Sequence, residues 1–294
     1  MNWKHIEQAI IAATGQNFRS DRASSVSGGC INSAYQLGGN GEEYFVKLNS
    51  ADRLDMFEAE AAGLEELAEA NEVLVPAPVC TGITGNQCYI VMQYIAFGGS
   101  GGSHLMTKFG EQLAQLHRHT RDQFGWYRDN TIGSTHQPNR YENDWLTFWR
   151  QHRLGFQLQM AIRHGLGADA QQKGEQLIEQ LDRFFAGYKP QASLLHGDLW
   201  SGNYAISRNG EPVIFDPAVY FGDREADLAM TELFGSFGQD FYAAYNASWP
   251  LDQGYSVRKT LYNLYHILNH YNMFGGGYGS QAVGMMDCLL SELR

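Results

Sequence analysis

Three polar side chains in the second half of the sequence have the types and order of a catalytic base followed by two metal ligands. They are Asp198, Asn203 and Asp216. Asp198 ends a His-Gly-Asp turn that comes after a short apolar run, which places its carboxylate at the mouth of a loop. Asn203 comes five positions later, so both side chains can face one site. Oxygen ligands of this kind suit Mg²⁺, which keeps several waters and bridges to phosphate oxygens.

The residues between Asn203 and Asp216 predict a β-hairpin that returns Asp216 to the side where the segment began. Strand-forming runs at 204–207 and 212–215 flank Asn209-Gly210, a sequence that favours a two-residue turn. A surface loop with ordinary polar residues is the alternative, and the His-Gly-Asp tripeptide alone does not exclude it. The whole order, with an Asn at +5 and an Asp on the far arm of a hairpin, favours a phosphotransferase site.

A second group of candidates lies upstream, at the tip of a hairpin predicted over residues 26–37. Gly28, Gly29 and Cys30 occupy this tip. Glycines here let backbone N–H groups approach phosphate oxygens without an intervening side chain. A Gly-Gly turn is most often only a turn, so the functional interpretation depends on the neighbouring elements of the chain.

A strand lysine and then a glutamate-rich helix come next in the chain. Lys47 ends the apolar run at 43–48, and a helix is predicted over 52–70. Glu60 lies beside the apolar stripe of this helix and is the preferred partner for Lys47, with Glu58 as a competitor. Glycine hairpin, strand lysine and helix glutamate is the order in which protein-kinase-like folds hold the α- and β-phosphates of ATP.

A second hairpin, over 73–79 and 87–95, leads into a Gly/Ser run that starts at Ala96 and breaks regular structure. We expect Gln93, Tyr94 and Ile95 to form a hinge whose backbone hydrogen-bonds adenine. The predicted fold class is therefore α+β and bilobal, of the protein-kinase-like type. Residues 1–95 would form a small β-rich ATP-binding lobe, and residues 96–294 a larger, mostly helical lobe for catalysis and acceptor binding.

The second lobe is predicted to contain several helices and one long irregular loop. Helical periodicity is found over 106–117, 144–160, 172–186, 224 onward and 261–270. The segment 124–139 has no helical or strand period, and we expect it to border the acceptor pocket, since long loops in compact proteins are often functional.

Several polar residues on these helices have both a structural and a functional interpretation. His117 lies on a core helix and is expected to be structural. Asp227, in a first helical turn, could accept hydrogen bonds from the catalytic-loop backbone. His266 and His270 share one helix face at i, i+4, but with no Glu or Cys nearby they are expected to pack or to line the acceptor pocket rather than bind zinc.

Composition limits the possible partners. With 294 residues, 44% hydrophobic residues and a net charge of −11, the chain is globular and acidic. An acidic protein is a poor ligand for nucleic acid or an anionic membrane, so neither is expected as a partner. The N-terminal residues lack the apolar core of a signal peptide, and no run of 18 apolar residues occurs, so the expected location is the cytoplasm.

The cysteines show no metal-ligand spacing and are expected to be reduced thiols. They are Cys30, Cys80, Cys88 and Cys288. Cys30 could have a lowered pKa among the backbone N–H groups of its turn and pair with a second copy upon oxidation. A small residue that fills a gap is the equally supported alternative, so the protein would be a monomer or a redox-sensitive dimer.

Taken together, the segments SGGCINSAY, YFVKLN, MFEAEAAGL, DNTIGSTHQPN, LLHGDLWSGN, IFDPAVYFGDREADLAM and LYNLYHILNHYNMFGGGY resemble the fructosamine kinase (ketosamine 3-kinase) family. This family is a branch of the protein-kinase-like fold near aminoglycoside and choline kinases, and the resemblance spans about residues 20–285. Trp200, within HGDLWSGN, is its most distinctive residue. His136 departs from the pattern, since proline is expected there.

The resemblance implies a chemistry and an acceptor. Asp198 would be the base, Asn203 and Asp216 would hold Mg²⁺, and Lys47 with Glu60 would position ATP. The acceptor would be the 3-hydroxyl of the sugar in a ketosamine, either free or on a glycated protein, which makes the reaction a deglycation repair step. A kinase for another small molecule, such as an aminoglycoside or choline, a non-catalytic nucleotide-binding module and a metal-dependent hydrolase are the alternatives.

Overall fold

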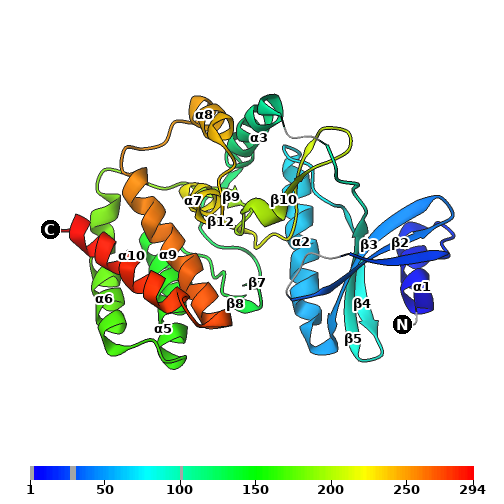
Figure 1. Cartoon of the computed structure of the whole chain (residues 1–294), viewed down its shortest axis with the longest axis horizontal. Coiled ribbons are helices and arrows are strands. Elements are labelled where there is room, and N and C mark those ends of the chain that lie inside the picture. The colour runs from blue at the N-terminus through cyan, green and yellow to red at the C-terminus, as the bar shows by residue number, and fades with distance from the viewer. Residues whose placement is uncertain (1–2, 27–30, 100–101) are drawn as a thin grey trace. The chain divides into compact units, whose positions relative to one another are not determined.

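The computed structural model describes residues 3–26, 31–99 and 102–294. The chain forms two units (Figure 1). The first unit comprises the residues up to 101 together with 204–217, and the second comprises 102–203 and 218–294. One unit is rich in β-strands and the other is mostly helical, which confirms the predicted α+β class. The finer prediction, that function divides at residues 95 and 96, stays a prediction.

The first unit is built on a five-stranded antiparallel sheet in the order β1-β2-β3-β5-β4. Its strands are β1 (Arg22–Val26), β2 (Ser33–Gly39), β3 (Glu42–Ser50), β4 (Pro78–Thr84) and β5 (Gln87–Gln93). The predicted hairpin at 73–95 is present, but its first strand begins at Pro78 rather than Val73. The described residues of this unit also form the α-helices α1 (Trp3–Thr14) and α2 (Leu54–Ala70), the latter preceded by a 3₁₀ turn at Ala51–Arg53.

Strand alternation places these helices on opposite faces of the sheet (Figure 1). Val46 is fully buried and packs with Ile6 and Ile10 of α1. The next residue, Lys47, points to the other face and meets Glu60 of α2. A period of two along β3 therefore separates a dry hydrophobic core from a charged site.

The hairpin predicted after Asn203 is present as β10 (Tyr204–Ile206) and β11 (Pro212–Ile214). Its loop differs from the prediction, because Ser207 N donates to Glu211 O at 2.9 Å and leaves three residues, 208–210, in the turn. Gly210 has φ 77°, the left-handed residue that closes a three-residue hairpin loop.

The linker after Ile95 also differs from the prediction of irregular structure. Phe97 forms an antiparallel bridge with Ser207, and Gly98 N donates to Ile206 O at 3.2 Å. The linker therefore acts as a short third strand on the hairpin.

The second unit is mostly helical. Its α-helices are α3 (Ser103–Leu116), α4 (Trp145–Phe148), α5 (Gly155–Arg163), α6 (Ala168–Glu179), α7 (Glu225–Leu233), α8 (Gln239–Ser248), α9 (Tyr255–Phe274) and α10 (Tyr278–Glu292). A π-helical turn at Trp149–Leu154 joins α4 to α5, so the single helix predicted over 144–160 is continuous but widened in its middle. α9 is buried over most of its middle, from Leu261 to Asn269, and packs against α5, α7 and α10.

Short strands complete the second unit. β6 (Thr120–Arg121), β9 (Ala192–Leu195) and β12 (Tyr220–Gly222) form a three-stranded sheet in the order β12-β9-β6. The segment 124–139, predicted to be irregular, contains the hairpin β7 (Asn130–Ile132) and β8 (Thr135–Gln137). His136, where proline was expected, lies in β8 opposite Thr131. Within the described residues, no helix has the length and apolar character needed to cross a bilayer.

Candidate active site

Lys47 is the centre of a buried charge cluster in the first unit. The residue is 5% exposed, and its Nζ lies 2.6 Å from Glu60 Oε1. Nζ also forms an ion pair with Asp216, which comes after β11. Glu60, the preferred of the two glutamates, is therefore a partner of Lys47, and a third charge joins the pair from a position 169 residues away in sequence.

The two carboxylates control the charge of Lys47. Burial alone would lower the pKa of Lys47, but the negative charges of Asp216 and Glu60 outweigh it and raise the pKa above its ordinary value. The pKa of Glu60 is raised as well, first by burial and then by repulsion from Asp216, against the attraction of Lys47. Lys47 is thus held as a cation and can present a fixed positive charge to an anion.

Asp216 has an unusual backbone conformation. Its φ is 57°, in the left-handed region, which costs a residue with a side chain about 1–2 kcal/mol. About 43% of its side chain is exposed, so the carboxylate can be reached by a ligand. A strained, accessible carboxylate paired with a buried lysine is typical of a functional site.

In the second unit, the loop after β9 carries Asp198 and Asn203. Asn203 Nδ2 donates to the backbone O of Asp198 at 2.9 Å and to Asp198 Oδ2 at 3.1 Å. The two side chains that the sequence placed on one loop are therefore in direct contact, and the Asn203 amide fixes the orientation of the Asp198 carboxylate.

Asp227 anchors the start of this loop, as predicted. Asp227 Oδ2 accepts from His196 N at 2.7 Å, and Oδ1 accepts from Gly197 N at 2.8 Å. Burial opposes its ionisation, but the hydrogen bonds from His117 and from the backbone N–H of Gly197 lower the pKa of Asp227 below its ordinary value. His117 is fully buried and its pKa is lowered, chiefly by burial. Its Nδ1 also contacts Tyr245 Oη at 2.8 Å, which agrees with a structural role.

Gly197 is required where the loop meets the segment after Asp216. Its φ is 83°, and a Cβ atom there would lie 2.1 Å from the carbonyl O of Ala218. Ala218 N in turn donates to His196 O at 2.8 Å. Only glycine permits this contact. The sequence predicted the turn at Gly197 but not its contact with the backbone of Ala218.

The other predicted cofactor residues form two groups in the sequence, 28–30 and 93–95. Gly28, Gly29 and Cys30 lie outside the described residues. Gln93 ends β5, where its N–H donates to Ala77 O at 2.8 Å, and Tyr94 and Ile95 come next in the linker. The adenine-binding role of Gln93, Tyr94 and Ile95 stays a prediction.

The acceptor candidates belong to a row of aromatic rings in the second unit. Trp200 meets Phe234 edge-on at 6.2 Å, and Phe234 lies 4.8 Å from the ring of His270. His270 also contacts Tyr278 at 5.1 Å. His266 is 4% exposed, and burial, helped by His270, lowers its pKa to about 3. Trp200 and His270 are thus linked through Phe234, whereas His266 is buried and its ring contacts that of Tyr265 at 5.0 Å.

The structure also reveals a buried carboxamide cluster that the sequence did not indicate. It consists of Asn130, Gln137 and Asn139, all under 10% exposed. Gln137 Nε2 donates to Asn130 Oδ1 at 2.8 Å, and Arg153 donates to Asn139 Oδ1 at 2.6 Å. The loop predicted to border the acceptor pocket is therefore anchored internally. Its concentration of carboxamides was the available signal.

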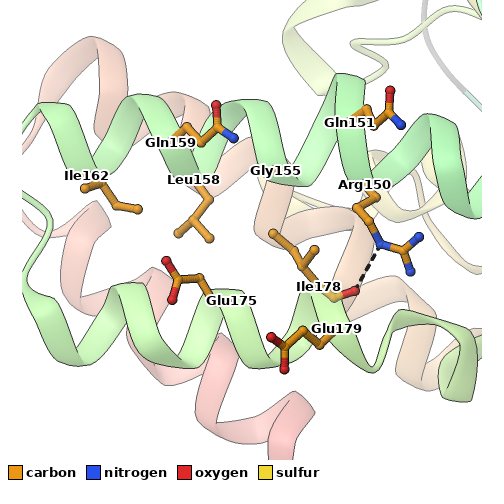
Figure 2. A pocket seen from close by; sticks show the side chains of 9 residues that line it. All are labelled: Arg150, Gln151, Gly155, Leu158, Gln159, Ile162, Glu175, Ile178 and Glu179. Atoms are coloured by element: carbon orange, nitrogen blue, oxygen red, sulfur yellow. Dashed lines mark hydrogen bonds between the residues drawn. The ribbon is translucent and has the colours of Figure 1, made fainter.

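A shallow groove of about 470 Å³ lies elsewhere in the second unit, between α6 and the helical stretch that includes α5 (Figure 2). Leu158, Ile162 and Ile178 provide its apolar surface, and Arg150 Nε donates to Ile178 O at 3.2 Å across one end. None of the candidate residues lines this groove, and the assignment of the active site to the loop that carries Asp198 and Asn203, here called the catalytic loop, stays a prediction.

Asn203 and Asp216 have the kind of oxygen donors that Mg²⁺ prefers, and their role as its ligands stays a prediction. No cluster of three or more His, Cys, Asp or Glu side chains with metal-binding arrangement occurs in the part of the chain that is described. One amide and one carboxylate would be the small protein contribution expected where phosphates and waters complete the shell of Mg²⁺.

These features define a class. A five-stranded sheet with a lysine–glutamate pair, a helical unit with an Asp–Asn catalytic loop, and a carboxylate after the next hairpin are the elements of a protein-kinase-like phosphotransferase. The fold is shared with an aminoglycoside phosphotransferase, APH(4)-Ia, whose crystal structure aligns with a TM-score of 0.60 at 16% identity over 97% of this chain and 98% of that chain.

The chain belongs to the fructosamine kinase family, whose model matches residues 2–292. It is 47% identical to a Synechocystis protein named a probable ketoamine kinase, over 98% of this chain and 97% of the relative. It is 42% identical to a chloroplastic protein-ribulosamine 3-kinase of Oryza sativa, over 97% and 83%. A crystal structure from Haemophilus somnus, provisionally named a fructosamine-3-kinase, aligns with a TM-score of 0.90 at 29% identity, over 98% and 97%.

Proposed function

We propose that the protein is an ATP-dependent kinase that phosphorylates the 3-hydroxyl of the sugar moiety of ketosamines, of the fructosamine or ribulosamine type. The observation that carries the proposal is the family match over residues 2–292, on a chain whose catalytic loop holds Asp198 and Asn203 in contact. Relatives named for ketoamine and ribulosamine substrates support the choice of acceptor. The physiological role would be the repair of glycated amines or proteins, and the proposed compartment is the cytoplasm.

In this proposal, Asp198 removes the proton from the acceptor hydroxyl as the hydroxyl oxygen bonds to the γ-phosphorus of ATP in line. The bond from that phosphorus to the β,γ-bridging oxygen breaks, and ADP leaves. The hydrogen bond from Asn203 Nδ2 keeps the Asp198 carboxylate oriented for that transfer. Lys47, held as a cation by Glu60, binds the α- and β-phosphates. Asn203 and Asp216 would hold Mg²⁺, which supplies neutralisation of charge on the phosphoryl oxygens when bound.

Recognition of the remaining parts of the substrates is assigned to three other groups. The loop with Gly28, Gly29 and Cys30 would cover the phosphates through its backbone. The backbone of Gln93, Tyr94 and Ile95 would bind adenine. Trp200, His266 and His270 would contact the acceptor. Trp200 and His270 are partly exposed, which supports this role, since aromatic faces attract both sugars and the cationic amine of a ketosamine.

The experiment is an ATP-consumption screen with ribulosamine, fructosamine and aminoglycoside acceptors. Its second step is identification of the phosphorylated position. We expect turnover with a ketosamine and phosphate on the 3-hydroxyl. Turnover with aminoglycosides alone would support the other kinase class, and free phosphate without a phosphorylated acceptor would support a hydrolase.

Asp198→Asn is the matching test of mechanism. The variant should fold and bind ATP, because the amide keeps the size of the side chain. It should lose about 10²–10⁴-fold in kcat, the value of a general base. Near-normal turnover with a ketosamine would remove Asp198 from the role of base.

The quaternary state is proposed to be a monomer in reducing conditions or a dimer joined through Cys30 after oxidation. Subunit mass measured with and without a thiol reductant, on the parent and on Cys30→Ser, distinguishes the two states.

A further inference from the structure

Gln137 is a buried carboxamide whose three hydrogen bonds join three separate segments of the second unit: β7, the segment before β12, and α9. The residue is 1% exposed. Its Nε2 donates to the backbone O of Ala218 at 3.1 Å and to Asn130 Oδ1 at 2.8 Å. Its Oε1 accepts from Tyr265 Oη at 2.6 Å. Because both ends of this buried carboxamide are hydrogen-bonded, Gln137 holds its neighbours in one arrangement.

The neighbour that matters is the peptide segment of Ala218 and Val219. Gln137 takes the carbonyl of Ala218, and Asn130 Nδ2 takes the carbonyl of Val219 at 2.8 Å. Two consecutive carbonyl groups are thus held by two side chains of one hairpin, β7–β8. We call Asn130 and Gln137 the carboxamide clamp.

The clamped segment, Ala218 and Val219, follows Asp216 in sequence and contacts the loop that carries Asp198. Ala218 N donates to His196 O, and the carbonyl of Ala218 lies against Gly197, directly before Asp198. In the chain, Ala218 comes two residues after Asp216. Asp216 has the left-handed φ of 57°, which persists only where the surroundings fix the backbone.

We propose that Gln137 is a positioning residue that keeps the backbone after Asp216 in register with the catalytic loop and so maintains the metal-binding conformation of Asp216. Without the clamp, the Ala218 peptide can rotate, and Asp216 can relax to an ordinary conformation. The role assigned to Asp216 rests on the proposed function, whereas the restraint on Ala218 does not.

Tyr265 makes the clamp sensitive to α9. Its ring is 2% exposed, and its hydroxyl fixes which end of the Gln137 carboxamide faces Ala218. A tyrosine O–H that donates to Oε1 leaves Nε2 as the only end that can donate to a carbonyl. Tyr265→Phe removes the hydrogen bond that orients the Gln137 carboxamide but leaves Nε2 able to donate to Ala218 O and Asn130 Oδ1. It is therefore a milder second variant.

The test uses Gln137→Met, with Gln157→Met as the matched control. Gln157 is also a fully buried glutamine of the second unit, and its Nε2 donates to Asn269. It hydrogen-bonds with Tyr265 but not with the Ala218 segment, so it also controls for a disturbance of Tyr265. Both substitutions remove a buried carboxamide and keep a similar volume. Circular dichroism and urea unfolding establish that each variant is folded.

Two readouts are measured on the full-length proteins. The first is hydrogen exchange of the Ala218 amide, which we expect to be faster in Gln137→Met and unchanged in Gln157→Met. The second is the dissociation constant of Mn²⁺ in the presence of ADP, from electron paramagnetic resonance. It should rise about fivefold to thirtyfold in Gln137→Met, the equivalent of losing the restraint on one left-handed residue, and less than twofold in the control.

Equal shifts in both glutamine variants, or unchanged exchange and Mn²⁺ affinity in Gln137→Met, would overturn the proposal. If Gln137→Met does not fold, Tyr265→Phe decides by the same readouts, with a smaller rise expected and no rise counting against the clamp. Both measurements are independent of the acceptor, so loss of the ketosamine assignment would leave them interpretable.

Discussion

His266 should make the stability of the protein fall at mildly acidic pH by an amount that can be calculated. The imidazole is 4% exposed, and its Nδ1 has no hydrogen-bond partner among the described residues. Burial, with a smaller contribution from His270, lowers the pKa of His266 to about 3 in the folded protein. In the unfolded chain the pKa returns to about 6.5.

Between these two pKa values, the unfolded chain binds a proton that the folded protein does not. Lowering the pH therefore favours unfolding: the stability present above pH 6.5 is lost as the pH falls toward 3. From pH 7.5 to 5.0, one such group removes about 2 kcal/mol from the free energy of unfolding. Other buried histidines with lowered pKa, such as His117, add to the loss in the parent protein.

His266→Leu isolates the contribution of this one residue. The substitution keeps a similar volume and removes a nitrogen that has no partner among the described residues, so at pH 7.5 it should change stability by less than about 1.5 kcal/mol. Between pH 7.5 and 5.0, the variant should lose about 2 kcal/mol less than the parent.

Urea unfolding at several pH values, monitored by tryptophan fluorescence, measures this difference. Trp149 is a suitable reporter because its ring lies 5.6 Å from that of Tyr265, the residue before His266. Equal losses of unfolding free energy in parent and variant between pH 7.5 and 5.0 would refute the reasoning. His266 would then have the same pKa in the folded and the unfolded protein.

Two further substitutions test packing and charge. Gly197→Ala should lower the free energy of unfolding by about 2–4 kcal/mol, because the new Cβ would overlap Ala218 O. The control, Gly187→Ala, has a similar φ of 78° but lies in open space and should cost only about 1 kcal/mol. Similar urea midpoints for the two variants would contradict this. Arg258→Met should cost about 3–5 kcal/mol, because it leaves the fully buried Glu225 without its bidentate partner, and adding Glu225→Leu should recover much of the loss. Equal unfolding free energies for the single and double variants would show that no buried charge is left behind.

The sequence predicted the parts of the site that depend on local periodicity. Alternation along β3 was enough to turn Lys47 away from the hydrophobic core and toward the helix with Glu60. The position of Asp227 in the first turn of α7 was enough to predict its contact with the catalytic-loop backbone, now found at 2.7 and 2.8 Å. Both relations depend on the geometry of one strand or one helical turn.

The sequence did not predict contacts between side chains and distant backbone carbonyl groups. Gln137 and Asn130 bind carbonyl groups 81 and 89 residues away, and neither partner has a side-chain signature, because any residue has a carbonyl group. The short strands β7 and β8 have three residues each, too few for a period of two to be recognised.

A turn type was also misassigned for a definable reason. Asn209-Gly210 indicated a two-residue turn, but Ser207 also pairs with Glu211 through its side chain, which accepts from Glu211 N at 3.0 Å. This extra bond stabilises a three-residue loop, and the dipeptide preference alone does not include it.

The membership of residues 204–217 in the first unit has a consequence for synthesis on the ribosome. Asp216 is made 169 residues after Lys47, the residue it pairs with. At about 5–20 residues per second, roughly 10–30 s pass between them. Once β5 has been translated, a nascent chain contains all five strands of the sheet and Glu60 but not the hairpin β10–β11. The first unit therefore begins first and can be completed only when more than two-thirds of the chain has been translated.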